Sequence, residues 1–226
     1  RGEPVDGRLP SKGGRPLDTI GAGEIFGEMA VLSDQPRPAA ARAQTACTGW
    51  SMDAGELEAA LTRAPGFALM LMSVMFDRLR FVAARLAMRK GPRPLGGRLA
   101  ARLDPAVIAR VEDGLARSAV VRYPKGATLM HEGQSGTCLY LVKEGSVIIH
   151  VGRTAIERVP TGGTFGEMAV IDQSPRTASA TAETECELLA IDRASLIEAV
   201  KREPTLAATM LRDIAERLRY MNTQVA

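Results

Sequence analysis

A glutamate and an arginine nine positions apart occur twice in this sequence, each time around the same short stretch. Residues 26–31 read FGEMAV and are followed by Pro36-Arg37, and residues 165–170 repeat FGEMAV and are followed by Pro175-Arg176. The spacing is the same throughout, since 165 − 26 and 176 − 37 both equal 139. A carboxylate and a guanidinium placed around a glycine and a short turn can hold a small molecule that carries both hydroxyl groups and a phosphate.

The repeat extends well beyond this motif and needs no gap. A period of 139 residues is longer than the roughly 20–50 residues of a solenoid repeat, so it indicates two tandem domains. The length of 226 residues agrees, because a domain usually takes roughly 100–200 residues. The other matches at this spacing are Gly23 with Gly162, Thr45 with Thr184, Cys47 with Cys186, Asp53 with Asp192, Leu57 with Leu196, Pro65 with Pro204, Arg78-Leu79-Arg80 with Arg217-Leu218-Arg219, and Phe81 with Tyr220.

We divide the chain into a first unit at residues 1–90, a Gly- and Pro-rich linker at 91–103 and a second unit at 104–226. The second unit has a strand-rich stretch at 120–159, ahead of its FGEMAV motif. An equivalent stretch in the first unit would need more than the 25 residues that precede Phe26. We therefore expect a first unit that is N-terminally incomplete in this sequence, which begins with Arg1 rather than Met.

The elements that must position the motif change type along each unit. Residues 120–159 and 178–191 carry short apolar runs separated by glycine turns, which predicts several short strands in a sandwich or small barrel. From residue 195 to 221 the apolar spacing becomes helical and is interrupted at Pro204, and the first unit does the same around Pro65. Asp104-Pro105 predicts the start of a further helix. The expected fold is mainly β with α: tandem jelly-roll-like β-barrels (double-stranded β-helices), each followed by C-terminal helices.

Composition excludes several classes of protein. Hydrophobic residues at 46% and charged residues at 24% are ordinary for a soluble globular protein, and a net charge of +3 is too small to imply a nucleic-acid surface. The most apolar run, residues 67–76, is shorter than the roughly 20 residues of a membrane span and predicts a buried helix. No signal peptide is visible, so we expect a cytoplasmic protein. The matched Cys47 and Cys186 predict two equivalent buried positions.

The FGEMA…PR pattern, set between glycine-punctuated strands and paired helices, resembles the phosphate-binding cassette of cyclic nucleotide-binding domains. Two such domains in tandem are similar to the regulatory subunit of protein kinase A, and a single one resembles the sensor domain of the bacterial catabolite activator protein. The resemblance implies a regulatory module whose ligand is a cyclic nucleotide. Cyclic AMP is expected on family frequency, and cyclic GMP stays open. The resemblance implies no catalytic residue, no metal and no cofactor besides the ligand.

The resemblance assigns roles to the cassette of the second unit. Arg176 would bond the phosphate, Gly166 would let the backbone approach it, and Glu167 would accept from the ribose 2′-hydroxyl. The family pattern adds the backbone N–H groups of Ala169 and Thr177, and places Tyr220 where relatives carry a lid over the base. The full set of expected ligand-binding residues is Phe165, Gly166, Glu167, Met168, Ala169, Arg176, Thr177, Ala178 and Tyr220.

The equivalent set in the first unit is expected to form a degenerate site. Position 38 is proline, which has no N–H to offer the phosphate, and the strands that would form the other wall are missing from the sequence. This second-tier set is Gly27, Glu28, Met29, Ala30, Arg37 and Ala39.

Rival functions leave fewer traces in the sequence. A metal-dependent β-barrel enzyme would need more histidines than His131 and His150, and an iron–sulfur sensor would need about four cysteines where there are three. Two alternatives stay open: the sensing part of a transcription regulator whose DNA-binding segment lies outside this chain, and a structural tandem barrel without ligand. A protein effector or a homodimer are the expected partners, with no membrane and no nucleic acid. Ligand in the second unit would close helices 195–222 over the barrel, and helix 67–90 would pass the change on.

Overall fold

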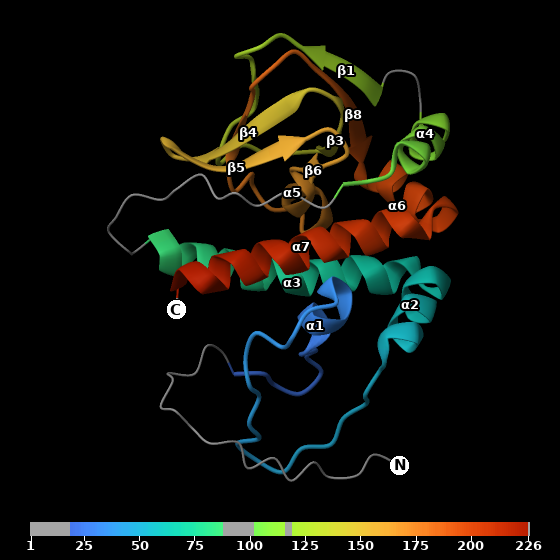
Figure 1. Cartoon of the computed structure of the whole chain (residues 1–226), viewed down its shortest axis with the longest axis vertical. Coiled ribbons are helices and arrows are strands. Elements are labelled where there is room, and N and C mark those ends of the chain that lie inside the picture. The colour runs from blue at the N-terminus through green and yellow to red at the C-terminus, as the bar shows by residue number, and fades with distance from the viewer. Residues whose placement is uncertain (1–18, 88–101, 116–118, 226) are drawn as a thin grey trace.

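The computed structural model describes residues 19–87, 102–115 and 119–225. Figure 1 shows the strands on one side of two long helices, α3 and α7, with the short helix α1 on the other side. Most of the linker at 91–103 lies outside the described residues. The second unit therefore contributes the β-sheets, and both units contribute to the helical layer across the middle of the molecule.

Two four-stranded antiparallel sheets form the body of the second unit. Their inner faces are apolar: Val142, Val147 and Leu188 are fully buried between them. One sheet has the order β1 (Val120–Tyr123), β8 (Cys186–Asp192), β3 (Cys138–Glu144), β6 (Thr164–Phe165), and the other has the order β2 (Thr128–Met130), β7 (Ser179–Ala182), β4 (Ser146–Val151), β5 (Thr154–Pro160). The sheets face each other rather than closing into one barrel, and they confirm the predicted jelly-roll-like, mainly β fold.

The helices of the second unit begin where the sequence predicts. Asp104 caps α4 (Pro105–Asp113), its carboxylate accepting from the N–H of Ala106 at 2.7 Å. The chain breaks between α6 (Arg193–Arg202) and α7 (Pro204–Val225), because Pro204 has no N–H and suits the first turn of a new helix. The short helix α5 (Glu167–Ile171) begins inside the repeated FGEMAV motif and ends one residue after it.

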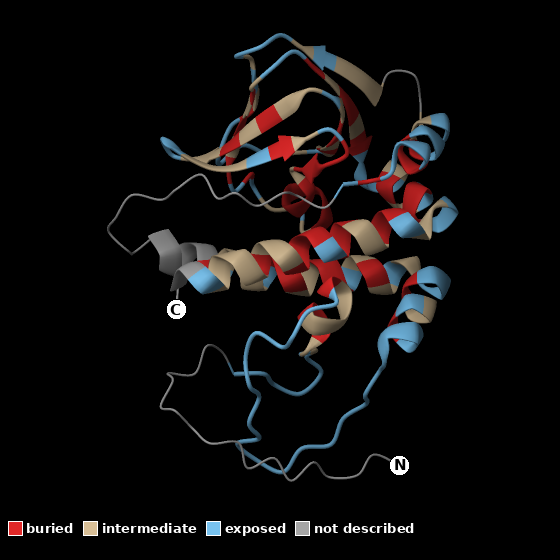
Figure 2. Ribbon diagram, viewed as in Figure 1, coloured by how far each residue is buried: buried red, intermediate tan, exposed pale blue. Residues whose placement is uncertain are grey.

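The described part of the first unit, residues 19–87, contains the helices α1 (Glu28–Ser33), α2 (Ala54–Arg63) and α3 (Pro65–Ala87), and no strand. Residues 40–53 correspond to β7 and β8 at the spacing of 139, yet they run exposed beside the helices (Figure 2). In the second unit those two strands pair with β1 to β4, whose counterparts in the first unit would fall before residue 19. A strand forms only against a partner, so these residues stay unpaired.

This difference corrects one prediction about the cysteines. Cys186 is buried, and its thiol donates to the carbonyl of Ser146 at 3.2 Å. Cys47 is exposed, so the prediction of two equivalent buried positions is wrong for the first unit. The physical reason is the same: the strand that carries Ser146 has no counterpart among the described residues 19–87.

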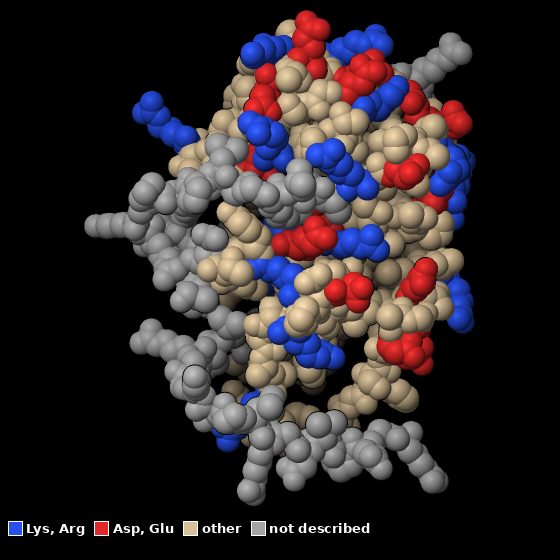
Figure 3. All heavy atoms as spheres, viewed as in Figure 1, with Lys and Arg blue, Asp and Glu red and all other residues tan. Residues whose placement is uncertain are grey.

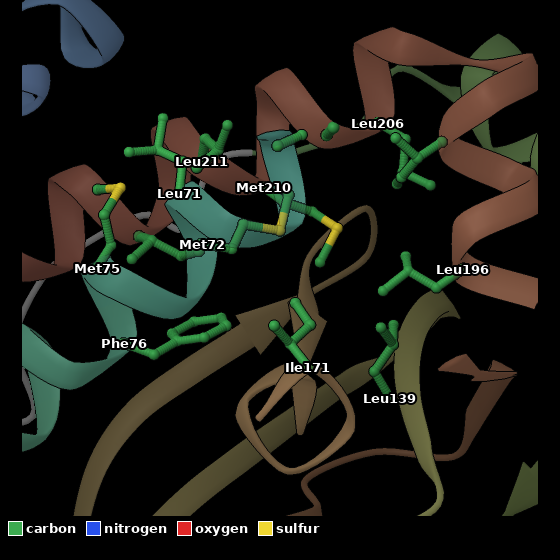
Figure 4. Close-up of a cluster of buried hydrophobic side chains, with 14 of the residues drawn as sticks. Leu71, Met72, Met75, Phe76, Leu139, Ile171, Leu196, Leu206, Met210 and Leu211 are labelled. Carbon is green, nitrogen blue, oxygen red and sulfur yellow. The ribbon is translucent and has the colours of Figure 1, made fainter. Parts of the chain in front are cut away.

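The two long helices α3 and α7 run side by side in the same direction and enclose the main core between them (Figures 1 and 4). Leu71, Met72 and Met75 of α3 are at most 1% exposed, and they meet Met210 and Leu211 of α7, which are at most 2% exposed. At the spacing of 139, Leu71 matches Met210 and Met72 matches Leu211. Equivalent positions of the two units therefore face each other, as across a two-fold axis.

Among the described residues no single helix is long and apolar enough to cross a membrane. Only α2 and the first part of α3 reach that length and composition when taken together, and they are bent by 115° at the break between them.

Candidate functional site

The cassette of the second unit starts with a glycine in a conformation that other residues avoid. Gly166 has φ of 78° and precedes Glu167, the first residue of α5. No side chain caps the start of this helix, so the N–H groups of its first turn have no side-chain acceptor. Such groups favour negative charge nearby. Gly27 has φ of 84° before α1, so both copies of the motif make the same turn.

Arg176 is anchored beneath this turn. Its guanidinium donates to the carbonyl of Gly166 at 2.6 Å and to the carbonyl of Cys138, on β3, at 2.5 Å. The guanidinium also lies 5.9 Å from the ring centre of Tyr140, which stacks on Phe165 at 5.2 Å. The side chain is thus held by the start of the motif, through Gly166, and by the neighbouring strand β3, through Cys138 and Tyr140.

The charge of Arg176 has no carboxylate partner within ion-pair distance in the part of the chain that the structure describes. The residue is only 6% exposed, and this burial lowers the pKa of its guanidinium, although an arginine keeps its proton. A buried cation whose contacts are two carbonyl groups and an aromatic ring is costly unless an anion joins it. The position is therefore built to receive negative charge.

Glu167 faces a different partner. Its carboxylate, 3% exposed as a residue, accepts from Arg217 of α7 at 2.7 Å. Arg217 also lies 3.0 Å from Asp213 and 3.2 Å from Glu157. Burial alone would lower the pKa of Arg217, but Glu157, Glu167 and Asp213 outweigh it and raise that pKa. The guanidinium thus fixes Glu167 in place and ties the cassette to α7.

Arg217 was not among the residues predicted from the sequence for this site. The signal was present, because Arg78 and Arg217 match at the spacing of 139 just as the motif arginines do. Gly136 was missed as well: a side chain there would collide with the guanidinium of Arg176. The sequence around Gly136 predicts only a turn. It does not show that this turn lies against Arg176, because only the fold brings the two together.

Most of the remaining predicted residues lie in α5 or shortly after it in the chain. Met168 and Ala169 lie in α5 and are buried, as is Ala178. Thr177 is exposed, and its hydroxyl lies 3.5 Å from the sulfur of Met168. The structure therefore brings residues 165–169 and 176–178 together. Tyr220 is half-buried on α7, three positions after Arg217 and so on a neighbouring part of the same helix face.

The first unit repeats half of this arrangement. Glu28 is buried and accepts from Arg78 of α3 at 2.5 Å, as Glu167 does from Arg217. Arg37 lies against Gly27, but it is exposed, as is Ala39. Gly27, Met29 and Ala30 keep their places at the start of α1. Nothing in residues 19–87 replaces β3, which covers Arg176 in the second unit.

The sequence of the chain matches the model of one protein family, described as the cyclic nucleotide-binding domain, over residues 7–64 and 120–203. The two matches together cover more than half of the chain, so the protein belongs to this family. They also follow the two units of the repeat, one match in each. The predicted family is therefore confirmed.

Individual relatives are regulatory proteins by name. The chain is 30% identical over 189 residues to a cAMP-dependent protein kinase regulatory subunit of Colletotrichum orbiculare, covering 82% of this chain and 43% of the relative. It is 32% identical over 131 residues to the CRP-like cAMP-activated global transcriptional regulator of Mycobacterium tuberculosis, covering 55% of this chain and 56% of the relative. Both relatives are named as regulators, and neither name states a catalytic activity.

Among solved structures, the catabolite activator protein of Thermus thermophilus matches with a TM-score of 0.47 and 30% identity, over 54% of this chain and 59% of that one. The chain spans less than half of the length of the protein kinase regulatory subunits that it matches.

Proposed function

We propose that the second unit binds cyclic AMP and that the chain is a regulatory module that responds to it. The observation that carries the proposal is Arg176, a buried cation that faces carbonyl groups and lies at the uncapped start of a helix. A cyclic phosphodiester has one negative charge and would supply the partner that this guanidinium lacks.

In this proposal each cassette residue contacts a different part of the ligand. Arg176 and the backbone N–H groups of Ala169 and Thr177 bind the phosphate, and Gly166 leaves the room for it. Glu167 accepts from the ribose 2′-hydroxyl, which discriminates against deoxyribose. Arg217 holds the Glu167 carboxylate ready for that bond. Tyr220 covers the base from α7.

The identity of the base rests on the relatives. The regulators matched above are named for cyclic AMP, which supports that nucleotide for this chain. Thr177 follows the arginine and is exposed, so its hydroxyl could reach the amino group of guanine. Cyclic GMP is therefore the competitor to compare.

We assign one working site to the chain. Arg37 is exposed and Pro38 has no N–H, so the first cassette lacks both the burial and one donor that a phosphate needs. The division into a first unit at 1–90, a linker at 91–103 and a complete second unit at 104–226 is part of the same proposal. The first unit then serves the second through its helices.

Coupling to a partner would run through α7. Glu167 is in the cassette and Arg217 is on the helix, so ligand that moves the glutamate also biases the helix. Ligand shifts the equilibrium only if it binds the closed arrangement of α6 and α7 more tightly than the open one. On the face shown in Figure 3, acidic and basic side chains of the described residues are interspersed, which suits a protein effector better than nucleic acid.

Calorimetric titration of the chain with cyclic AMP, and then with cyclic GMP, tests the proposal. We expect one site, tighter for cyclic AMP, and loss of the heat in Arg176→Ala. A contact between a charged group and its partner contributes about 1.5–3 kcal/mol, so this variant should bind at least roughly tenfold more weakly. The matched control is Arg37→Ala in the first cassette, which should bind as the unchanged chain does. No heat with either nucleotide, together with no shift of the melting temperature, would reject the proposal.

A further inference from the structure

Each long helix carries the sequence Arg-Leu-Arg, at 78–80 in α3 and at 217–219 in α7. The first arginine of each triplet pairs with the cassette glutamate of its own unit, Arg78 with Glu28 and Arg217 with Glu167. The middle leucine is buried in the core between the helices. The second arginine of each triplet contacts a residue of the other unit, Arg80 with Asp172 and Arg219 with Ser33.

Arg80 of the first unit reaches the end of the second cassette. Its guanidinium lies 2.8 Å from the carboxylate of Asp172, the residue that ends α5. Ser73, also on α3, donates to the other oxygen of the same carboxylate at 2.6 Å. The side chain of Asp172 is only 9% exposed, so two groups of the first unit hold a nearly buried carboxylate of the second.

We propose that Arg80 and Ser73 are positioning residues of the ligand site in the second unit. They hold α5 at its C-terminal end through Asp172, while Glu167 and Arg176 are fixed at its N-terminal end. The site is then complete only when α3 of the first unit is packed against it. This inference rests on the proposed function.

The length and charge of α5 explain why it needs such support. The helix has five residues, too few to be stable on its own hydrogen bonds. An acidic side chain at the C-terminal end of a helix is unfavourable, because the helix dipole is negative there. Asp172 therefore depends on the cation and the hydroxyl that α3 supplies. Without them the carboxylate would turn toward water and take the end of α5 with it.

The reverse crossing differs in charge. Arg219 of α7 donates to the hydroxyl of Ser33 at 2.8 Å and to the carbonyls of Gln35 and Pro36 at 3.1 and 2.7 Å. Ser33 is the counterpart of Asp172 at the spacing of 139. At this matched position the second unit therefore has a carboxylate that the other unit neutralises, whereas the first unit has a neutral hydroxyl and its Asp34 is exposed. The cassette of the second unit is the one to which we assign the ligand.

The test compares Arg80→Gln with its matched control Arg219→Gln in the full chain, with cyclic AMP as the probe. We expect Arg80→Gln to weaken cyclic AMP binding about tenfold, which lies within the roughly 5- to 150-fold effects typical of coupled sites. We expect Arg219→Gln to leave the affinity unchanged. Exchanging the charges in the double variant Arg80→Asp with Asp172→Arg should recover most of the lost affinity. This recovery would show that the ion pair between positions 80 and 172, and not the loss of Arg80 by itself, carries the effect. Equal affinity in Arg80→Gln and the unchanged chain would overturn the inference.

Two further measurements separate this inference from the proposed function. In the ligand-free chain, amide hydrogen exchange at 168–172 should be faster in Arg80→Gln than in Arg219→Gln, and equal rates would count against the positioning role. If Arg80→Gln does not fold, Asp172→Asn removes the charge and keeps the bond from Ser73, and the same weakening is expected. Binding that is lost in Arg176→Ala but intact in these variants rejects the inference alone. Absence of binding in the unchanged chain rejects the proposed function and the inference with it.

Discussion

Arg217 balances three carboxylates, those of Glu157, Glu167 and Asp213, at the junction of the cassette with α7. Replacing it in Arg217→Gln leaves buried carboxylates without a cation, which typically destabilises a protein by about 3–5 kcal/mol. We expect a loss of this size in urea unfolding at neutral pH. Arg212→Gln is the control, since Arg212 is exposed on the same helix and should change the stability by less than about 0.5 kcal/mol.

The pH dependence of that loss follows from its cause. Arg217 keeps its charge in the unchanged chain, because the three carboxylates raise its pKa. In Arg217→Gln the neighbouring carboxylates repel one another while they are ionised, and adding protons at low pH relieves this repulsion. The difference in unfolding free energy between the variant and the unchanged chain should therefore be larger at pH 8 than at pH 5. A difference independent of pH would contradict this account of the junction.

Much of the second cassette could be predicted from residues alone. The doubled motif identified Gly166, Glu167 and Arg176 together, because two copies in register are a strong signal. Arg217 escaped, since an arginine in an amphipathic helix ordinarily faces water. Its burial depends on which strand, here β5 with Glu157, lies over that face of α7, and no local pattern contains that information.

At the scale of elements, capping links the strand β8 to the helix α6. The carboxylate of Asp192 accepts from the N–H of Ser195 at 2.7 Å, and this bond lowers the pKa of Asp192. We expect Asp192→Ala to reduce the unfolding free energy by about 1 kcal/mol at pH 7. Because the folded pKa is below the unfolded one, the stabilisation is present above the unfolded value and is lost as the pH falls through the folded value. The unfolding free energies of Asp192→Ala and of the unchanged chain, measured in urea, should therefore become equal as the pH is lowered.

Asp113→Ala is the matched control for the cap. Asp113 is exposed in the last turn of α4, where a negative charge opposes the helix dipole, so its removal should not destabilise the chain at any pH. A loss in Asp113→Ala as large as in Asp192→Ala would mean that net charge, and not the cap, sets the effect.

Helices could be predicted more completely than strands. Asp104-Pro105, Pro65 and Pro204 each mark a helix start through local chemistry, and α4, α3 and α7 begin there. Residues 40–53 repeat the pattern of β7 and β8 but form no strand, because pairing partners come from distant parts of a chain. Trp50 is fully exposed as a result, whereas its counterpart Leu189 is fully buried. A repeat therefore predicts a strand only where the segments that pair with it are repeated as well.

At the scale of the whole molecule, α3 and α7 join the two units through a shared buried core. Their core consists of matched positions, so a single chain makes internally the kind of contact that two identical subunits make across a two-fold axis. The sequence predicted two tandem domains joined by a linker. The shared helical core could not be foreseen, because each helix taken alone shows only that one of its faces is apolar.

Phe76→Ala tests whether the two units unfold together. Phe76 is fully buried and points from α3 toward Ile171 of α5, so its truncation should reduce the unfolding free energy by about 3–5 kcal/mol. Because the core is shared, we expect one unfolding transition, reported together by far-ultraviolet circular dichroism and by chemical labelling of the thiol of Cys186, which is buried in the second unit, and we expect Phe76→Ala to shift both equally. Met70→Ala on the exposed side of the same helix should change neither by more than about 0.5 kcal/mol. Two separate transitions, of which Phe76→Ala shifts only one, would show that the units fold independently and that α3 does not bind the second unit as tightly as its burial indicates.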